Sequence, residues 1–243
     1  MPIVTTPCLV LQTHRFGDTS KILRLMTRDF GPRSAMARGA LRPRSRISGL
    51  LEPFSEGLVT LYLKANRDLH TLSGFELVRS RQDLGRDMER FAGASVLAEL
   101  VLRLAPEQRD VTLFEVLRDG LDALVEAPAG SVAAVAAARI WQLVAVLGFE
   151  PSLDACVSCG RVVQDREGAR LDTDEGGVRC LRCPARGVAL APAELAVLRA
   201  LVRGEVAPAV GGRQLGLLRD FIRVHVAEGA RLRSLDFLGV PED

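Results

Sequence analysis

The sequence predicts an α+β protein in which a five-stranded N-terminal barrel is followed by an all-α domain with an inserted four-cysteine module. Three observations predict this class: short β-forming runs in the first 80 residues, a helical period of apolar residues afterwards, and two Cys-x₂-Cys pairs within the helical region. The chain has 243 residues, 48% of them hydrophobic, which is enough for one large core and a small satellite. The predicted domains are, in chain order, barrel 1–80, first helical part 81–154, cysteine module 155–187 and second helical part 188–243.

Five β-like runs predict the barrel. They span residues 7–15, 22–27, 34–38, 57–64 and 70–78, and turn residues such as Gly17-Asp18 separate them. In the fourth run, Val59, Leu61 and Leu63 fall on one face, as expected of a strand with one buried side. An oligonucleotide/oligosaccharide-binding (OB) barrel has this size and strand count. Strand count alone leaves an SH3-like barrel as the alternative.

The helical part begins after about Asp83. Apolar residues recur at helical spacing over residues 94–104 and again over 113–124, so each segment has one apolar face. The stretch 131–147 is apolar on nearly every side, which predicts the central helix of a bundle. It is short for a membrane span and carries Arg139 and Gln142. Helical patterning returns at 192–203 and 214–238, so the cysteine module is expected to be an insertion between helices.

The cysteine pairs predict a zinc site. Cys156-x₂-Cys159 and Cys180-x₂-Cys183 are 20 residues apart, at the upper edge of the spacing of a four-thiolate zinc ribbon, and Gly160 gives the first turn conformational freedom. Disulfides or free thiols are the alternatives. Four protein ligands leave no open position for a substrate, so one structural Zn²⁺ is expected. With the ion bound the module carries a charge near −1, which disfavours phosphate, and partner docking is the alternative role. Cys8 is expected to be a small buried hydrophobe.

Basic residues gather in the N-terminal third. Net charge is +2, but residues 1–90 hold 15 Lys/Arg against nine Asp/Glu, whereas residues 91–154 hold four against nine. No acidic residue occurs between Asp29 and Glu52, a stretch that contains five arginines. Its segment 38–46, Arg-Gly-Ala-Leu-Arg-Pro-Arg-Ser-Arg, predicts an extended basic loop beside the barrel. This loop is expected to face a polyanion, and a merely solvated loop is the alternative.

Proteins that bind single strands combine such a basic groove with aromatic platforms. The barrel region contains Phe16, Phe30, Phe54, Tyr62 and Phe75, each of which is individually more typical of a core. Tyr62 shares its strand face with Thr60 and Lys64 and is the best stacking candidate.

An enzyme is not expected. The three histidines, His14, His70 and His225, do not neighbour a candidate nucleophile, and no phosphate-cradling glycine motif is present. His225 falls on the apolar stripe of a helix, which is typical of a structural residue. The closest acidic group, Asp172, Asp174 and Glu175, is interpreted as a turn inside the cysteine module. No secretory signal is recognised at the N-terminus, and a cytoplasmic protein is expected.

Three segments resemble the RecO family of recombination mediators. They are "ARGALRPRSRISGLLEPFSEGLVTLYL" with "LHTLSGFEL", "LGFEPSLDACVSCG" and "RVHVAEGARLRSLDFL", and they occur in the family's order along the whole chain. The resemblance implies an OB barrel that binds single- and double-stranded DNA and anneals complementary strands. It also implies a complex with RecR that helps RecA displace single-strand-binding protein, and a location at the nucleoid. A zinc-stabilised scaffold that binds only proteins is the alternative.

The resemblance also implies site residues. By match to the family's basic barrel surface, the DNA-contacting residues are Lys21, Arg24, Arg38, Arg42, Arg44 and Arg46. The four cysteines match zinc positions that some family members lack, which again favours a structural role for the metal.

Overall fold

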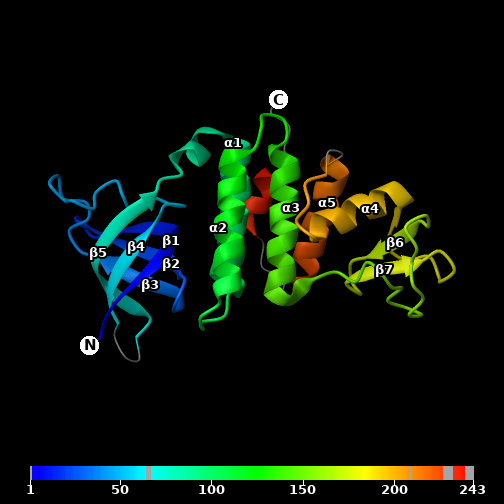
Figure 1. Cartoon of the computed structure of the whole chain (residues 1–243), viewed down its shortest axis with the longest axis horizontal. Coiled ribbons are helices and arrows are strands. Elements are labelled where there is room, and N and C mark those ends of the chain that lie inside the picture. The colour runs from blue at the N-terminus through cyan, green and yellow to red at the C-terminus, as the bar shows by residue number, and fades with distance from the viewer. Residues whose placement is uncertain (1, 64–66, 208–209, 227–231, 239–243) are drawn as a thin grey trace. The chain divides into compact units, whose positions relative to one another are not determined.

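The computed structural model of the chain describes residues 2–63, 67–207, 210–226 and 232–238. The chain folds into two compact units, Met1–Val125 and Glu126–Asp243 (Figure 1). The finer division made from the sequence, with boundaries after residues 80, 154 and 187, stays a prediction. Lys64, predicted as the last residue of the fourth strand, lies outside the described residues.

The first unit begins with a closed barrel of five strands, which confirms the predicted architecture. The strands are β1 (Ile3–Phe16), β2 (Ser20–Thr27), β3 (Gly31–Ala37), β4 (Glu56–Tyr62) and β5 (Leu69–Arg79). Their order is β1-β2-β3-β5-β4, and β4 pairs with β1 to close the barrel (Figure 1). The β3–β5 pair is parallel and the other pairs are antiparallel. This topology is that of an OB barrel rather than the SH3-like alternative.

Alternating residues fill the barrel interior. On β2, Leu23 and Leu25 lie in the core, whereas Arg24 between them is exposed on the outer face. This alternation follows from the two-residue period of a strand. Cys8 is completely buried in the same core, and burial raises the pKa of its thiol to about 12. The prediction that Cys8 is a small buried hydrophobe is therefore confirmed.

Two helices complete the first unit: α1 (Met88–Leu104) and α2 (Val111–Glu126), preceded by a 3-10 helix η1 (Gln82–Arg86). The Asp87 carboxylate accepts a hydrogen bond from the backbone N–H of Arg90 and caps the start of α1. The predicted apolar faces of both helices are buried, except that Leu104 at the end of α1 is half-buried.

A buried arginine joins the barrel to α2. The Arg81 side chain donates hydrogen bonds to the carbonyl of Phe54 at 3.0 Å and to the carboxylates of Glu56 at 2.7 Å and Asp122 at 2.6 Å. Partial burial opposes ionisation of Asp122, but Arg81 and Arg79 outweigh it and hold the pKa of this carboxyl below its ordinary value. Because folding lowers the pKa of Asp122, its ion pairs with Arg81 and Arg79 stabilise the unit at neutral pH. This stabilisation is lost progressively as the pH falls below about 4 and Asp122 becomes protonated.

The second unit contains three α-helices in the described residues. They are α3 (Val132–Val144), α4 (Pro192–Val202) and α5 (Gly212–His225), and both α4 and α5 pack against α3. At its end α3 passes into a π-helical turn, Ala145–Phe149, in which Gly148 has a φ of 92° and ends the helix. The segment Val132–Phe149 is long and apolar enough to cross a membrane, but 56% of it is buried within the fold, as for a core helix.

The predicted helical segment 214–238 is wrong in its extent. Helix α5 ends at His225, and a separate 3-10 helix η3 (Arg233–Phe237) follows, while residues 227–231 lie outside the described residues. The apolar stripe from Leu215 to Ile222 is buried as predicted. The helix ends at His225, with Val226 at its C-cap, so the spacing of apolar residues alone overstated its length.

The cysteine module lies between α3 and α4 in the sequence, as predicted. Its strands are β6 (Ala169–Asp172), β7 (Gly177–Cys180) and β8 (Val188–Leu190), in the order β7-β6-β8 (Figure 1). The acidic residues after β6 form the turn of the β6–β7 hairpin, as interpreted from the sequence. Arg179 pairs with the buried Asp172 at 2.6 Å, and Arg186 pairs with Asp174 at 2.9 Å. These acidic residues therefore form ion pairs within the cysteine module.

Candidate DNA interface and metal centre

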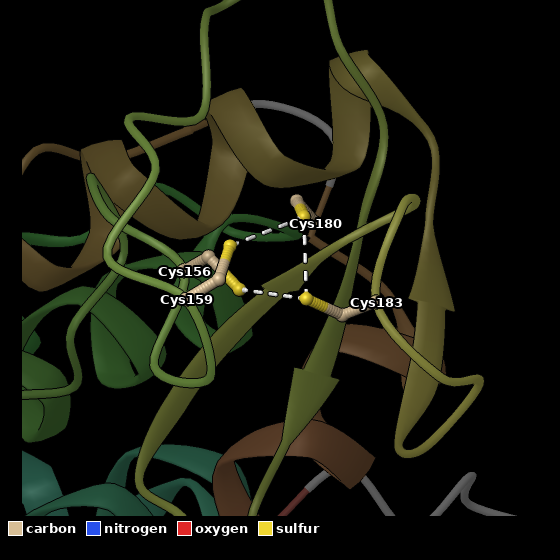
Figure 2. A group of neighbouring side chains, drawn as sticks. All are labelled: Cys156, Cys159, Cys180 and Cys183. Atoms are coloured by element: carbon tan, nitrogen blue, oxygen red, sulfur yellow. Dashed lines mark hydrogen bonds between the residues drawn. The ribbon is translucent and has the colours of Figure 1, made fainter.

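The four cysteines come from two tight turns that face each other across the module (Figure 2). The first turn is closed by a hydrogen bond from the N–H of Gly160 to the carbonyl of Cys156 at 2.8 Å, and Gly160 has a φ of 72°. This left-handed conformation is one that glycine adopts without strain. The second turn starts at the end of β7, where the N–H of Cys183 donates to the carbonyl of Cys180 at 3.2 Å.

The arrangement of the sulfurs fits a tetrahedral metal ion. All four Sγ atoms lie within 4.8 Å of one another. The Sγ–Sγ distance is 3.9 Å for Cys156 and Cys183, 3.8 Å for Cys159 and Cys180, and 3.7 Å for Cys180 and Cys183. A tetrahedron with metal–sulfur distances of about 2.3 Å has edges of about 3.8 Å. The cysteines do not form disulfides. The prediction that the four side chains converge on one position is confirmed, and the cluster could hold a metal ion.

The charges of the sulfurs also favour a cation. Burial opposes ionisation of Cys156, but backbone N–H groups, including those of Ser158 and Cys159, lower the pKa of this thiol to about 6. The thiol of Cys183 shows the opposite effect: its interaction with the side chain of Cys159 raises the pKa of Cys183 to about 12. Four thiolates this close repel one another, so their joint ionisation requires a positive ion between them.

A buried arginine of α4 braces the first cysteine turn. The Arg199 guanidinium donates to the carbonyls of Leu153 and Val163, both at 2.8 Å, on the two sides of that turn. It also pairs with Asp154 at 3.2 Å and Asp165 at 2.7 Å, but both acids are largely exposed, so water screens these pairs. The two carbonyl bonds are therefore the larger contribution.

Replacing Arg199 with Met is expected to lower the free energy of unfolding of the second unit by about 2–4 kcal/mol, because two buried carbonyls lose a charged donor. Chemical denaturation followed by circular dichroism measures the change. Arg203→Met is the control: this arginine is exposed and pairs with Glu205, so its loss is expected to leave the transition in place. Equal stability of the Arg199 variant would contradict the bracing role.

The basic loop is a chain of turns held on the end of the barrel, so the prediction of an extended loop is wrong. Successive hydrogen bonds join Arg42 to Gly39, Ser45 to Arg42 and Ser48 to Ser45 at 3.0–3.2 Å. Apolar residues of the loop reach into the barrel: Ala40 and Leu51 are buried in its core, and Ile47 and Leu50 pack against it. Burial of these side chains removes apolar surface from water, and this favours the coiled loop over an extended one. They also fix the intervening arginines on the outside.

The loop arginines are Arg38, Arg42, Arg44 and Arg46. All four are exposed, and no ion pair among the described residues includes any of them. The N–H of Leu41 donates to the carbonyl of Thr19 at 2.8 Å, which brings the loop against the turn between β1 and β2. The loop therefore presents a group of guanidinium ions that no carboxylate neutralises.

The two predicted DNA-contacting residues of β2 lie in different surroundings. The Lys21 side chain is 13% exposed and pairs with Glu52 at 2.9 Å, so it ties the strand to the end of the loop. Arg24 is exposed on the outer face of the barrel, opposite Ser34 of β3, and lines a pocket. The structure thus groups the loop arginines, while Arg24 belongs to a second basic region.

The aromatic residues divide by exposure. Phe54 and Phe75 are buried, whereas Phe16 is 52% exposed and Tyr62 37% exposed. Phe16 ends β1 and pairs with Ser20, next to the turn that the basic loop contacts. Tyr62 pairs with Ile3 on β1 and Thr71 on β5. Phe16 is therefore the aromatic side chain closer in the fold to the loop, although the sequence favoured Tyr62.

Sequence reasoning missed three further arginines. Arg33, Arg67 and Arg103 line the same pocket as Arg24, from β3, the segment before β5 and the last turn of α1. Arg33 belongs to the acid-free stretch, which was a partial signal. Arg67 and Arg103 stand alone in sequence, so only the folded chain brings them to the others.

Comparisons with known proteins agree over most of the chain. The family model described as "Recombination protein O N terminal" matches residues 1–81, and the one described as "Recombination protein O C terminal" matches residues 85–236. A DNA repair protein RecO from Symbiobacterium thermophilum is 35% identical over 211 residues, which cover 85% of this chain and 82% of the relative. One from Rubrobacter xylanophilus is 34% identical over 223 residues, covering 90% and 88% respectively. One from Anaeromyxobacter sp. is 34% identical over 244 residues, covering 95% and 93%.

Proposed function

Because this chain belongs to the RecO family of DNA repair proteins, which are non-enzymatic recombination mediators, we propose that it binds single- and double-stranded DNA and anneals complementary strands. We further propose that it acts with RecR to assist the loading of RecA onto DNA coated with single-strand-binding protein. The cytoplasm, at the nucleoid, is the compartment in which these partners meet.

The loop arginines are the observation that carries this proposal. An arginine whose charge no carboxylate neutralises binds phosphate in a bidentate manner, and such binding needs no base-specific contact. Arg24 extends the basic surface along the outer face of β2. Lys21 contributes by holding Glu52 and the end of the loop in place. The exposed ring of Phe16 provides a surface on which a base can stack beside the loop.

The metal in this proposal is one structural Zn²⁺. Cys156, Cys159, Cys180 and Cys183 supply four thiolates, the ligand type that selects zinc in closed tetrahedral sites. When bound, the ion joins the two cysteine turns and leaves no position for a substrate. Arg179 and Arg186 of the module pair with Asp172 and Asp174, so these two arginines are already neutralised, and we assign the module the role of a brace for the second unit.

A salt titration tests the proposed function. The full chain is mixed with labelled single-stranded and duplex oligonucleotides, and the association constant is measured between about 30 and 300 mM salt. Five arginine–phosphate contacts predict a slope of log K against log salt of about −3.5 on single strands and about −4.5 on duplexes, since each contact contributes roughly 0.7 and 0.9 respectively. No association at the lowest salt would favour the alternative, a zinc-stabilised scaffold that binds only proteins.

A further inference from the structure

We propose that the arginine-lined pocket is a second phosphate-binding site, which holds a DNA strand at the opposite end of β3 from the loop arginines. This inference rests on the proposed function and extends its DNA path. The pocket has a volume of about 620 Å³ and lies within the first unit, between the strands β2, β3 and β5 and the end of α1.

The charge of the pocket favours an anion. Its lining contains four arginines, against two carboxylates; the lining residues with charge are Arg24, Arg33, Arg67, Arg103, Asp68 and Glu107. The C-terminal end of α1 also contributes a partial negative charge, which opposes anion binding over a short range. Glu99 offsets the charge of Arg103, but the three other arginines outweigh the two lining carboxylates and the end of the helix, so the pocket keeps a net positive potential.

The guanidinium groups are suited to phosphate. Nη1 of Arg33 donates to the backbone carbonyls of Pro32 at 2.6 Å and Glu107 at 3.0 Å, which fixes its orientation without neutralising its charge. No ion pair among the residues that the structure describes includes Arg24, Arg33 or Arg67. Arg103 pairs with Glu99 at 2.8 Å and is 36% exposed. A fixed guanidinium loses little entropy when it binds an anion.

The spacing between the two basic regions suits one strand of DNA. Arg33 lies near the start of β3, and Arg38 follows its end. The five residue steps from Arg33 to Arg38 cover about 17 Å. A stacked single strand advances about 3.4 Å per nucleotide, so roughly five nucleotides connect the loop to the pocket. Arg24, on the outer face of the barrel opposite Ser34, belongs to the pocket end of this path. This number of nucleotides falls within the roughly 4–16 that one OB barrel accommodates.

Oligonucleotide length tests the proposal. In the full chain, Arg67→Glu and, separately, Arg103→Gln are compared with the wild type on oligothymidylates of four and twelve nucleotides. We expect the dissociation constant for the twelve-mer to rise about tenfold and its salt slope to weaken by about 0.7 per lost contact, while the four-mer is unaffected. Arg86→Glu is the charge control, because Arg86 lies before the other end of α1, about 25 Å away along the helix.

Two outcomes would overturn the proposal. Wild-type affinity and salt slope for the twelve-mer in both pocket variants would exclude the pocket from the DNA path. Weakened binding of adenosine monophosphate with unchanged binding of the twelve-mer would assign the pocket to small phosphate compounds instead. Loop variants separate this inference from the proposed function. If they lose both oligonucleotides while the pocket variants lose neither, only the pocket inference fails; if no variant changes DNA binding, the proposed function fails.

Discussion

Reversing Arg42, Arg44 and Arg46 to glutamate is expected to reduce DNA binding at least about a hundredfold at low salt and to abolish strand annealing. Three guanidinium groups would be replaced by carboxylates that repel phosphate, so the salt slope on single strands should weaken by about 2. Fluorescence anisotropy with labelled oligonucleotides measures binding, and energy transfer between complementary labelled strands measures annealing.

The fold of this triple variant is expected to persist. The three side chains are exposed and no described ion pair includes them, while the apolar anchors of the loop are unchanged. Arg166→Glu together with Arg182→Glu is a control on the cysteine module, where two exposed arginines are reversed in the same way. Undiminished DNA binding by the triple variant, or an equal loss in the control, would contradict the assignment of the loop.

Replacing Cys159 or Cys180 with serine is expected to release the metal and unfold the cysteine module. Metal binding to four-thiolate modules is coupled to folding, and the apparent binding free energy in zinc-finger peptides is about 10–16 kcal/mol, more than a small module's own core supplies. One zinc per chain is expected in the wild type by atomic absorption, and less in the variants. A melting curve of each protein, with and without a chelator, measures the accompanying loss of stability.

Cys8→Ala is the matched control for the metal site. Cys8 lies in the barrel core, far in sequence from the cysteine turns, so its replacement should leave the zinc content unchanged. Because the loop arginines belong to the first unit, the serine variants are expected to lose folding of the second unit rather than DNA binding alone. A serine variant that remained stable and retained zinc would exclude the metal site; one that remained stable but lost only DNA binding would move the DNA site to the module.

The sequence by itself determined most of the helices and strands and the four cysteines that cluster where a metal could bind. Strand alternation around Val59 and Leu61 reports which side of a strand is buried, and the period of the later helices reports their apolar faces; both are local properties. The Cys-x₂-Cys pairs are also local, since each pair forms within one turn. The absence of acids between Asp29 and Glu52 likewise marked the basic loop directly.

Only the tertiary structure decided the shape of the loop, the end of the last long helix and the partners of the charged residues. The loop coils because Ala40 and Leu51 enter the barrel core, and Lys21 is neutralised because folding places it beside Glu52. The pocket gathers Arg33, Arg67 and Arg103 from segments far apart in the chain. Charge acts through space over distances set by the fold, whereas sequence patterns record only neighbours along the chain, so these features require the folded arrangement.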